Sequence, residues 1–174
     1  MLGHGAGGGV GAPDLQAAAG CARELGYGTV LVEQPYRVAG RRSPPRAPVL
    51  DAAWVAVLAA LAGELSPPLI VGGRSSGARV ACRTADALSA GAVLGLAFPL
   101  QPPRRRTSGT PPPSRLDELD AVRVPVLVVQ GERDPFGVPP RGKRRSVVVL
   151  PGDHGLKSDL PGLRKAVTQW LSRR

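Results

Sequence analysis

Continuous apolar runs alternate with helical patterns along most of the chain. Five short segments are apolar almost throughout and are predicted strands: residues 29–32, 69–72, 92–98, 124–130 and 146–150. Apolar residues recur at helical spacing in four others: residues 14–25, 51–61, 78–88 and the segment after Pro161. Apolar strands that alternate with helices are typical of a parallel sheet covered on both faces. The pattern predicts a three-layer α/β sandwich, with a mostly parallel sheet of about five strands and helices on both faces.

Polar and proline-rich stretches separate these segments. Asp14 and Asp51 are predicted N-caps of the first two helices. Residues 37–48 form a predicted loop, and residues 99–113, rich in proline and arginine and without periodicity, form a second loop or flap. A length of 174 residues suits one domain with a sizeable core, so we expect a single domain over residues 1–174.

The amino-acid composition indicates what the core consists of and which partners the protein is expected to bind. The chain is 43% hydrophobic but only 3% aromatic, so its core must consist of Val, Leu and Ala. The chain has 23 Lys and Arg residues against 13 acidic residues, which gives a net charge of +10. Such a charge is typical of proteins that bind nucleic acid. The arginines are scattered through loops, without aromatic residues between them to stack on bases. We therefore expect no specific nucleic-acid partner.

The cysteines and the N-terminus suggest neither a disulfide nor a membrane anchor. Cys21 and Cys82 fall on alanine-rich faces of predicted helices and are expected to be small core residues. No apolar run is long enough to span a bilayer, and the N-terminus lacks a charged start followed by an apolar stretch. We expect a cytoplasmic protein with no membrane partner.

A serine lies at a glycine-flanked turn between a predicted strand and the next helix. The segment Gly73-Arg74-Ser75-Ser76-Gly77 fits the pattern G-x-S-x-G, in which glycines permit an approach of strand and helix that a side chain would block. Such a turn holds the serine hydroxyl in a strained, exposed position beside the N–H groups of the helix start. The pentapeptide alone is equally compatible with an ordinary turn.

Two further residues suited to chemistry follow the last two predicted strands. The carboxyl ends of parallel strands meet at one edge of a sheet, so Asp134 and His154 are expected beside Ser75. A serine nucleophile needs an imidazole base, and the imidazole needs a carboxylate that fixes its tautomer. Singly, each residue has an ordinary explanation in a turn or loop; together they predict a catalytic triad. Asp153 is the competing carboxylate, but it is poorly placed to reach the ring of its neighbour.

The glycine-rich start of the chain suits the other requirement of acyl transfer, a pair of N–H donors for the oxyanion. The N–H of Ser76 is predicted to supply one. Residues 4–8 resemble the His-Gly loops that supply the second, which makes the Ala6 N–H the expected partner. His4 is expected to shape this loop rather than act as a base.

These motifs resemble those of the α/β-hydrolase superfamily, in which Ser, Asp and His follow one another in this order. The resemblance is to its small, lidless dienelactone-hydrolase-like branch, which includes a testis-expressed protein and the hydrolase-like domain of a chromatin-complex subunit. The residues that carry it are 4–8, 33–40, 73–79, 98–100, 131–137 and 153–155. The resemblance implies a serine hydrolase that cleaves an ester, thioester or related acyl bond of a small molecule. It implies no metal and no organic cofactor.

One departure concerns the first residues. Members of this fold usually have two or three strands before the His-Gly loop, whereas only three residues precede His4 here. We therefore expect a fold that lacks its first strands, including the one that holds the oxyanion loop. A start codon placed too late would explain this, and the missing strands would then lie upstream of Met1.

Two other functions stay open. Residues 3–8 also fit G-x-G-x-x-G, with Glu33 at the distance of a ribose-binding acid, which is typical of dinucleotide-binding domains. Against this, no strand is predicted before the glycines, and Pro13 delays the helix that should meet the pyrophosphate. The second alternative is a catalytically silent α/β-hydrolase-like module that binds partners.

Neither the substrate nor the oligomeric state follows from the sequence. The candidates for the substrate pocket are His4, Arg37, Arg74 and Phe98. Arginines near the site suggest an anionic or polar substrate, although solvated surface arginines are the commoner explanation.

Overall fold

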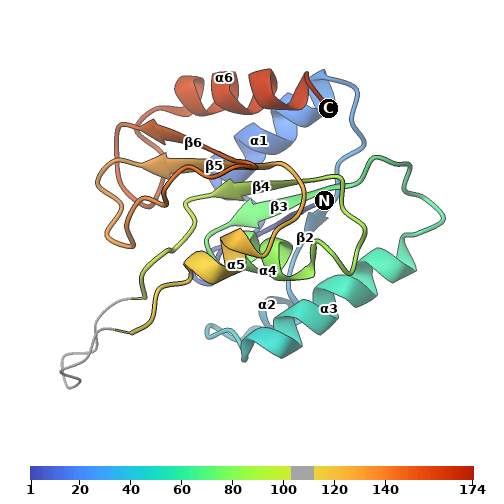
Figure 1. The fold of residues 1–174 in the computed structure, drawn as a ribbon. Helices are drawn as coiled ribbons and strands as arrows, with labels where there is room; N and C mark the ends of the chain where they lie inside the picture. The colour runs from blue at the N-terminus through green and yellow to red at the C-terminus, as the bar shows by residue number, and fades with distance from the viewer. Residues whose placement is uncertain (103–111) are drawn as a thin grey trace.

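The strands of the chain form one parallel sheet. The structure is a computed structural model that describes residues 1–102 and 112–174. Its strand order is β2-β1-β3-β4-β5-β6, and every neighbouring pair is parallel (Figure 1). The strands are β1 (Leu2–Gly3), β2 (Leu31–Val32), β3 (Ile70–Arg74), β4 (Ala92–Leu96), β5 (Val126–Gly131) and β6 (Arg145–Leu150). The predicted α/β sandwich is confirmed, with six strands rather than about five.

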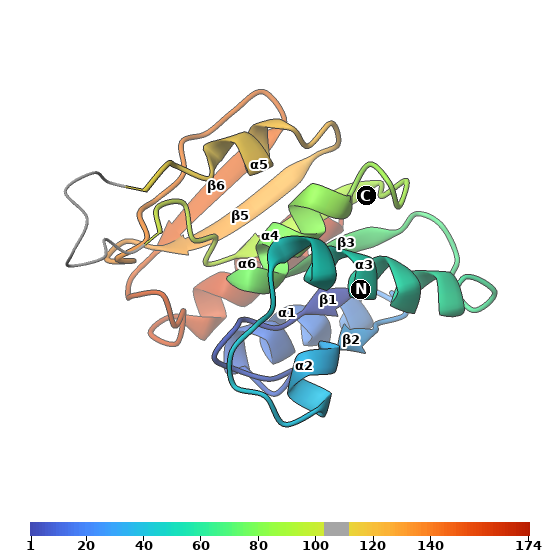
Figure 2. The ribbon, with the colours of Figure 1, turned by 90° about the horizontal axis from the view of Figure 1, so that it is seen from below.

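Helices cover both faces of this sheet. They are α1 (Pro13–Glu24), α2 (Pro35–Val38), α3 (Ala47–Ala60), α4 (Ser76–Thr84), α5 (Leu116–Asp120) and α6 (Leu160–Leu171). Helices α1 and α6 lie on one face, and α3 and α4 lie on the other, where Figure 2 shows them in front of the sheet. Since successive strand residues point to opposite faces, Val93 and Val128 pack toward α3 and α4, while Leu94 and Leu127 pack toward α1 and α6.

A strand precedes the glycine-rich loop of residues 4–8, contrary to the expectation from the sequence. Leu2 and Gly3 form β1, which pairs with β2 on one side and with β3 on the other. The Leu2 N–H donates to the Val30 carbonyl at 2.8 Å, and the Gly72 N–H donates to the Met1 carbonyl at 2.9 Å. Two residues are too few to show any periodicity, so the pattern could not reveal this strand.

The predicted loop over residues 37–48 is shorter than expected. Its start belongs to α2, and α3 begins at Ala47 instead of Asp51. Both helices carry a proline in their first turn, where its missing N–H has no intrahelical acceptor to lose. Of the prolines in the predicted loop, Pro48 therefore marks a helix start, whereas Pro44 and Pro45 lie in the loop that remains.

Three further expectations concern the cysteines, membrane-spanning helices and the loop over residues 99–113. Cys21 and Cys82 are free and buried, and burial raises the pKa of the Cys82 thiol to about 12. Within the part of the chain that the structure describes, no helix has the length and apolar character needed to cross a membrane. Most of the predicted loop over residues 99–113 lies outside the described residues, because these stop at 102 and resume at 112.

Candidate active site

Ser75 occupies a strained turn between β3 and α4. Its φ of 52° and ψ of −111° are unusual for a residue with a side chain and cost about 1–3 kcal/mol. The turn is held in place because its N–H donates to the Leu96 carbonyl at 2.8 Å. Gly73 and Gly77 allow it to form, since a Cβ at either position would overlap the carbonyl oxygen of Gly3. The surrounding backbone thus imposes the conformation that exposes the hydroxyl.

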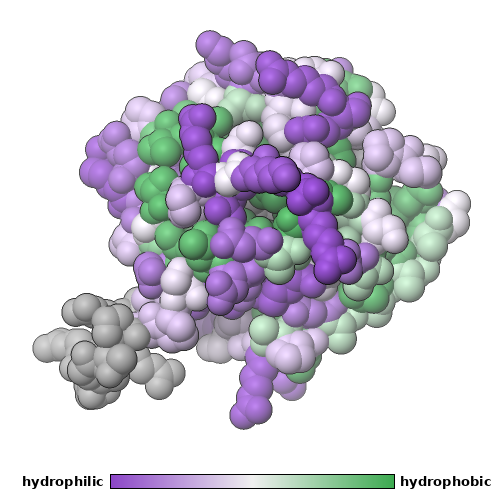
Figure 3. All heavy atoms as spheres, in the orientation of Figure 1, coloured by the Kyte–Doolittle hydropathy of each residue, from purple (hydrophilic) through white to green (hydrophobic). Residues whose placement is uncertain are grey.

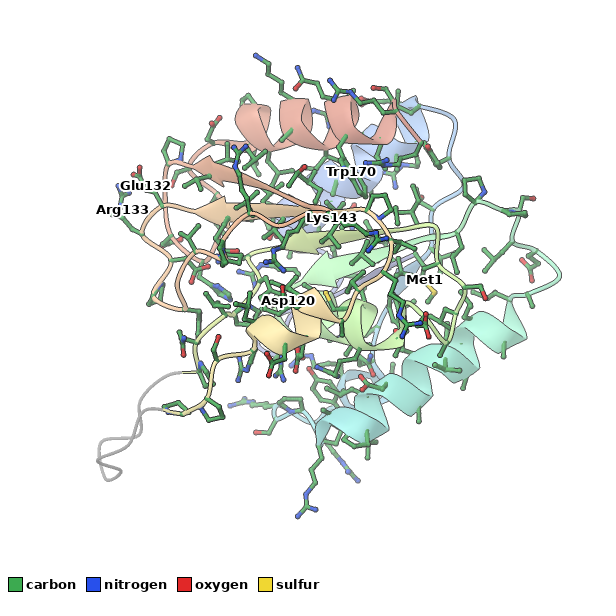
Figure 4. All side chains as sticks on the ribbon, in the orientation of Figure 1. Met1, Asp120, Glu132, Arg133, Lys143 and Trp170 are labelled. Atoms are coloured by element: carbon green, nitrogen blue, oxygen red, sulfur yellow. The ribbon has the colours of Figure 1, made fainter. Side chains whose placement is uncertain are left out.

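His154 and Asp134 extend from Ser75 in an unbroken hydrogen-bonded chain. His154 Nε2 lies 3.0 Å from Ser75 Oγ, and His154 Nδ1 lies 2.8 Å from Asp134 Oδ2. The carboxylate can only accept, so Nδ1 carries the ring proton and Nε2 presents its lone pair to the serine hydroxyl. The three residues follow β3, β5 and β6, whose carboxyl ends meet at the edge marked in Figure 4 by Glu132 and Arg133.

Asp153, the competing carboxylate, has a local role. Its Oδ1 accepts the Gly155 N–H at 2.8 Å, which closes a turn within its own loop. Asp134, by contrast, has a fully buried side chain in contact with the imidazole. The geometry therefore pairs His154 with Asp134 and not with its sequence neighbour.

The surroundings of Asp134 include two residues that the sequence did not single out. Gln130, fully buried in β5, donates through Nε2 to Asp134 Oδ2 at 2.7 Å, and the Phe136 N–H donates to Oδ1 at 2.9 Å. The Phe136 ring also lies against the imidazole, with centroids 4.5 Å apart and planes inclined by 57°. The only signal in the sequence was a glutamine at the end of an otherwise apolar strand.

The loop of residues 4–8 lies against the serine turn. A Cβ at Gly5 would come within 3.3 Å of the Ser75 Cβ. His4 is buried and locked in one tautomer, because its Nε2 accepts the Gln34 N–H at 3.0 Å while Nδ1 contacts the Gly5 carbonyl at 2.8 Å. Tyr36 donates to the Ala6 carbonyl at 3.1 Å. Burial raises the pKa of Tyr36 above its ordinary value.

Ser76, the other predicted source of an N–H donor, is the first residue of α4. Its N–H has no intrahelical acceptor and belongs to the positive end of the helix dipole. The helix start and the loop of residues 4–8 therefore both lie next to Ser75.

The four pocket candidates occupy different environments. His4 and Phe98 are 2% and 0% exposed, so neither ring offers an open surface. Arg37 is half-buried in α2. The Arg74 side chain turns inward, where it pairs with Asp14. Asp14 thus forms an ion pair instead of the predicted N-cap, which is taken by Ala12.

The arrangement of the first residues also bears on the dinucleotide alternative. A strand does precede the glycines, so the expectation that none would is wrong. The second objection stands: α1 starts only at Pro13, which has no N–H to offer a pyrophosphate at the helix N-terminus.

Comparisons with known proteins agree with this architecture. Residues 1–159 match the model of the α/β hydrolase domain family, and the chain belongs to that family. No curated protein sequence matches the chain.

Solved structures with the same fold include three of the serine-hydrolase or esterase type. XC6422 from Xanthomonas campestris, an α/β serine hydrolase without a lid, is 22% identical with a TM-score of 0.74, over 99% of this chain and 80% of that one. An α/β serine hydrolase homologue from Coxiella burnetii is 19% identical with a TM-score of 0.75, and the match covers 98% of this chain and 85% of that one. Est1E from Butyrivibrio proteoclasticus, solved with ferulic acid bound, is 16% identical with a TM-score of 0.76, and the match covers 99% of this chain and 87% of that one.

Proposed function

We propose that this protein is a serine hydrolase that cleaves an ester, thioester or related acyl bond of a small molecule, with Ser75, His154 and Asp134 as its catalytic triad. The observation that carries the proposal is the continuous contact from the strained serine through the imidazole to the buried carboxylate, at 3.0 and 2.8 Å. Membership of the α/β hydrolase family supports the same class of reaction.

In this proposal the first half of the reaction transfers the acyl group to the enzyme. His154 Nε2 takes the Ser75 proton while Oγ attacks the carbonyl carbon of the substrate. The resulting oxyanion is stabilised by the N–H groups of Ser76 and Ala6. The imidazolium then gives its proton to the departing alcohol or thiol as the carbonyl re-forms, which leaves an acyl-enzyme.

Water completes the cycle by the same steps. His154 removes a proton from water, the hydroxide attacks the acyl carbon, and Ser75 leaves with the proton returned by the imidazolium. Asp134 stays ionised throughout, holds the ring in the required tautomer and stabilises its charged form. Two structural neighbours, Est1E with ferulic acid bound and the esterase domain of a Rhodothermus marinus protein, support acyl esters as the first substrates to assay. The resemblance to the dienelactone-hydrolase-like branch belongs to the same proposal.

The proposal is tested with a fluorophosphonate probe, which phosphonylates an activated serine with loss of fluoride. We expect the folded protein to be labelled once and Ser75→Ala to lose both the labelling and the hydrolysis of a nitrophenyl ester. Ser146→Ala, which alters an exposed serine on β6, is the matched control and should keep both.

The outcome also separates the enzyme from the alternatives. Folded wild-type protein that resists the probe and hydrolyses no ester would overturn the proposal and favour a catalytically silent binding module. Labelling that persists in Ser75→Ala would place the nucleophile elsewhere.

A further inference from the structure

Arg74 precedes Ser75 and contacts the start of α1 and two of the loops beside the serine. Its Nε pairs with Asp14 Oδ2 at 2.9 Å, at the start of α1. Its Nη2 donates to the backbone carbonyl of His154 at 2.9 Å. Its Nη1 lies beside the oxyanion loop, since a Cβ at Gly5 would come within 2.9 Å of it. One guanidinium thus joins the helix start, the glycine loop and the histidine loop.

The ion pair fixes the direction of this guanidinium. The side chains of Arg74 and Asp14 are 18% and 1% exposed, so neither group is surrounded by water. Burial raises the pKa of Asp14, and the charge of Arg74 opposes that shift, which means that the carboxylate depends on this arginine as its counter-ion. A buried charge that loses its partner is strongly destabilising, so the guanidinium is held where the carboxylate is.

The histidine loop depends on contacts of this kind. Apart from the bonds of the His154 ring to Ser75 and Asp134, the other hydrogen bonds of this turn among the described residues are local or lead to the segment after β5. Gly152 accepts from the Arg133 N–H, and Asp153 accepts from the Leu156 and Gly155 N–H groups. The Arg74 bond is the one that ties the backbone of His154 to the strand that carries Ser75.

We propose that Arg74, held by Asp14, is a positioning residue that sets the distance between His154 and Ser75. This inference rests on the proposed function, because it concerns the base of that reaction. Arg74 is the residue between Gly73 and Ser75 in the G-x-S-x-G pattern, where any residue type is allowed. The proposal gives this residue a role in the geometry of the triad. Misplacement of a catalytic group by about 1 Å can lower a rate about 100-fold, so a single backbone bond can matter for catalysis.

The first test measures the rate of phosphonylation of Ser75. Arg74→Met keeps the length and the apolar stem but removes both contacts, and we expect it to react about 10- to 100-fold more slowly than wild type. In ester hydrolysis kcat should fall and KM should stay near its wild-type value, since the bond orients the base and not the substrate. Arg74→Lys can reach one of the two partners, so an intermediate rate is expected.

The second test observes His154 without catalysis. The chain has only two histidines, so 15N-histidine labelling gives two ring N–H signals that are readily assigned. The His154 Nδ1 proton, held by Asp134, should exchange faster with water in Arg74→Met. The His4 Nδ1 proton, bonded to the Gly5 carbonyl, serves as an internal reference for an intact fold. Asp14→Asn should produce the same change in weaker form and add little to Arg74→Met.

Arg164→Met is the matched control, because Arg164 also pairs with a carboxylate of α1, Glu24, at 2.7 Å but in an exposed position. It should leave the labelling rate and the His154 signal unchanged. If Arg74→Met, Arg74→Lys and Asp14→Asn all keep the wild-type rate and the wild-type exchange of His154, the proposal is overturned. If the wild type resists the probe, the proposed function fails, while the exchange of His154 still decides whether Arg74 positions the ring.

Discussion

At the scale of single residues, the buried carboxylate of Asp134 depends on a neutral neighbour. Gln130 Nε2 faces three acceptors: Asp134 Oδ2, and the carbonyls of Phe98 and Gly137 at 3.1 and 3.0 Å. The amide must therefore present its NH2 group to the site, since its oxygen there would face only other oxygens. A residue at position 130 that has the same size as glutamine but presents only hydrogen-bond acceptors should break this arrangement.

We predict that Gln130→Glu destabilises the protein increasingly as pH rises. Two carboxylates at hydrogen-bond distance cannot both ionise, so the pair must keep a proton in the folded state and its pKa is raised. The free energy of unfolding relative to wild type should therefore fall from pH 5 to pH 8, by up to about 1.4 kcal/mol per pH unit. Denaturant titrations at both pH values check this, and a penalty that does not depend on pH would contradict it.

The sequence indicated the residues of the proposed triad but not the groups that hold them. The sequence predicts that Ser75, Asp134 and His154 lie close together, because each residue follows an apolar run that is visible in the sequence. The bonds from Gln130 to Asp134 and from Arg74 to the histidine loop join segments whose relative placement is set by packing. No local pattern reports such contacts, so the sequence gives no sign that Arg74 bonds to the histidine loop.

At the scale of elements, α4 reaches the sheet only because glycines line the contact. We predict that Gly77→Ala lowers the free energy of unfolding by about 3 kcal/mol, since its Cβ would overlap the Gly3 carbonyl oxygen and force β1 and α4 apart. Gly95→Ala on β4 is the control, because its Cβ would meet Val128 at 3.7 Å and both Ala78 and the Leu127 carbonyl oxygen at 3.8 Å, which are ordinary contacts. That variant should change stability by less than about 1 kcal/mol. Equal effects at both positions in chemical denaturation would contradict the prediction.

Helix α5 is attached to α4 by charge. Glu118 accepts from Arg79 Nε at 2.9 Å and from Arg83 Nη1 at 3.3 Å, and Arg83 also pairs with Asp51 on α3 at 2.7 Å. Burial alone would raise the pKa of Glu118, but the two arginines outweigh burial and hold that pKa below its ordinary value. The carboxylate therefore stabilises the folded protein when it is ionised.

We predict that Glu118→Gln costs about 2 kcal/mol of unfolding free energy at pH 7. Because the pKa is lowered in the folded state, this contribution is present above the ordinary pKa of a glutamate and is lost as pH falls through the folded value. The difference from wild type should therefore shrink in strongly acidic solution. Glu132→Gln, which breaks an exposed pair with Arg133, should have little effect at either pH.

The helices and strands differ in how well the sequence predicts them. The strands β3 to β6 coincide with apolar runs, the helices α1 and α6 coincide with apolar residues at helical spacing, and each lies within a few residues of its predicted bounds. Strand β1, with two residues, and α2, with four, belong to no such run or period, whereas the equally short β2 ends the apolar run over residues 29–32. Proline misled the prediction of α3, since Pro48 is typical of loops and equally of a first helical turn.

At the scale of the whole molecule, the sheet joins two cores. One contains Trp54 of α3 and the other Trp170 of α6, and they are the only tryptophans of the chain. Strands β4 and β5 contribute alternate residues to both, and Figure 4 shows Trp170 on the α6 side of the sheet. On the face drawn in Figure 3, hydrophilic side chains are interspersed with hydrophobic ones.

We predict that both cores unfold in one transition, as expected of a single domain over residues 1–174. Trp54→Phe retains only Trp170, and Trp170→Phe retains only Trp54, so each variant reports on one face of the sheet. In each variant the midpoint of fluorescence in a denaturant titration should coincide with that of far-UV circular dichroism, because strands shared by two cores cannot keep one when the other is lost. A Trp170 midpoint below that of the circular dichroism would show that α1 and α6 separate first. The histidine loop, which lies between β6 and α6, would then detach from Ser75 before the sheet unfolds, and activity would be lost with the Trp170 signal.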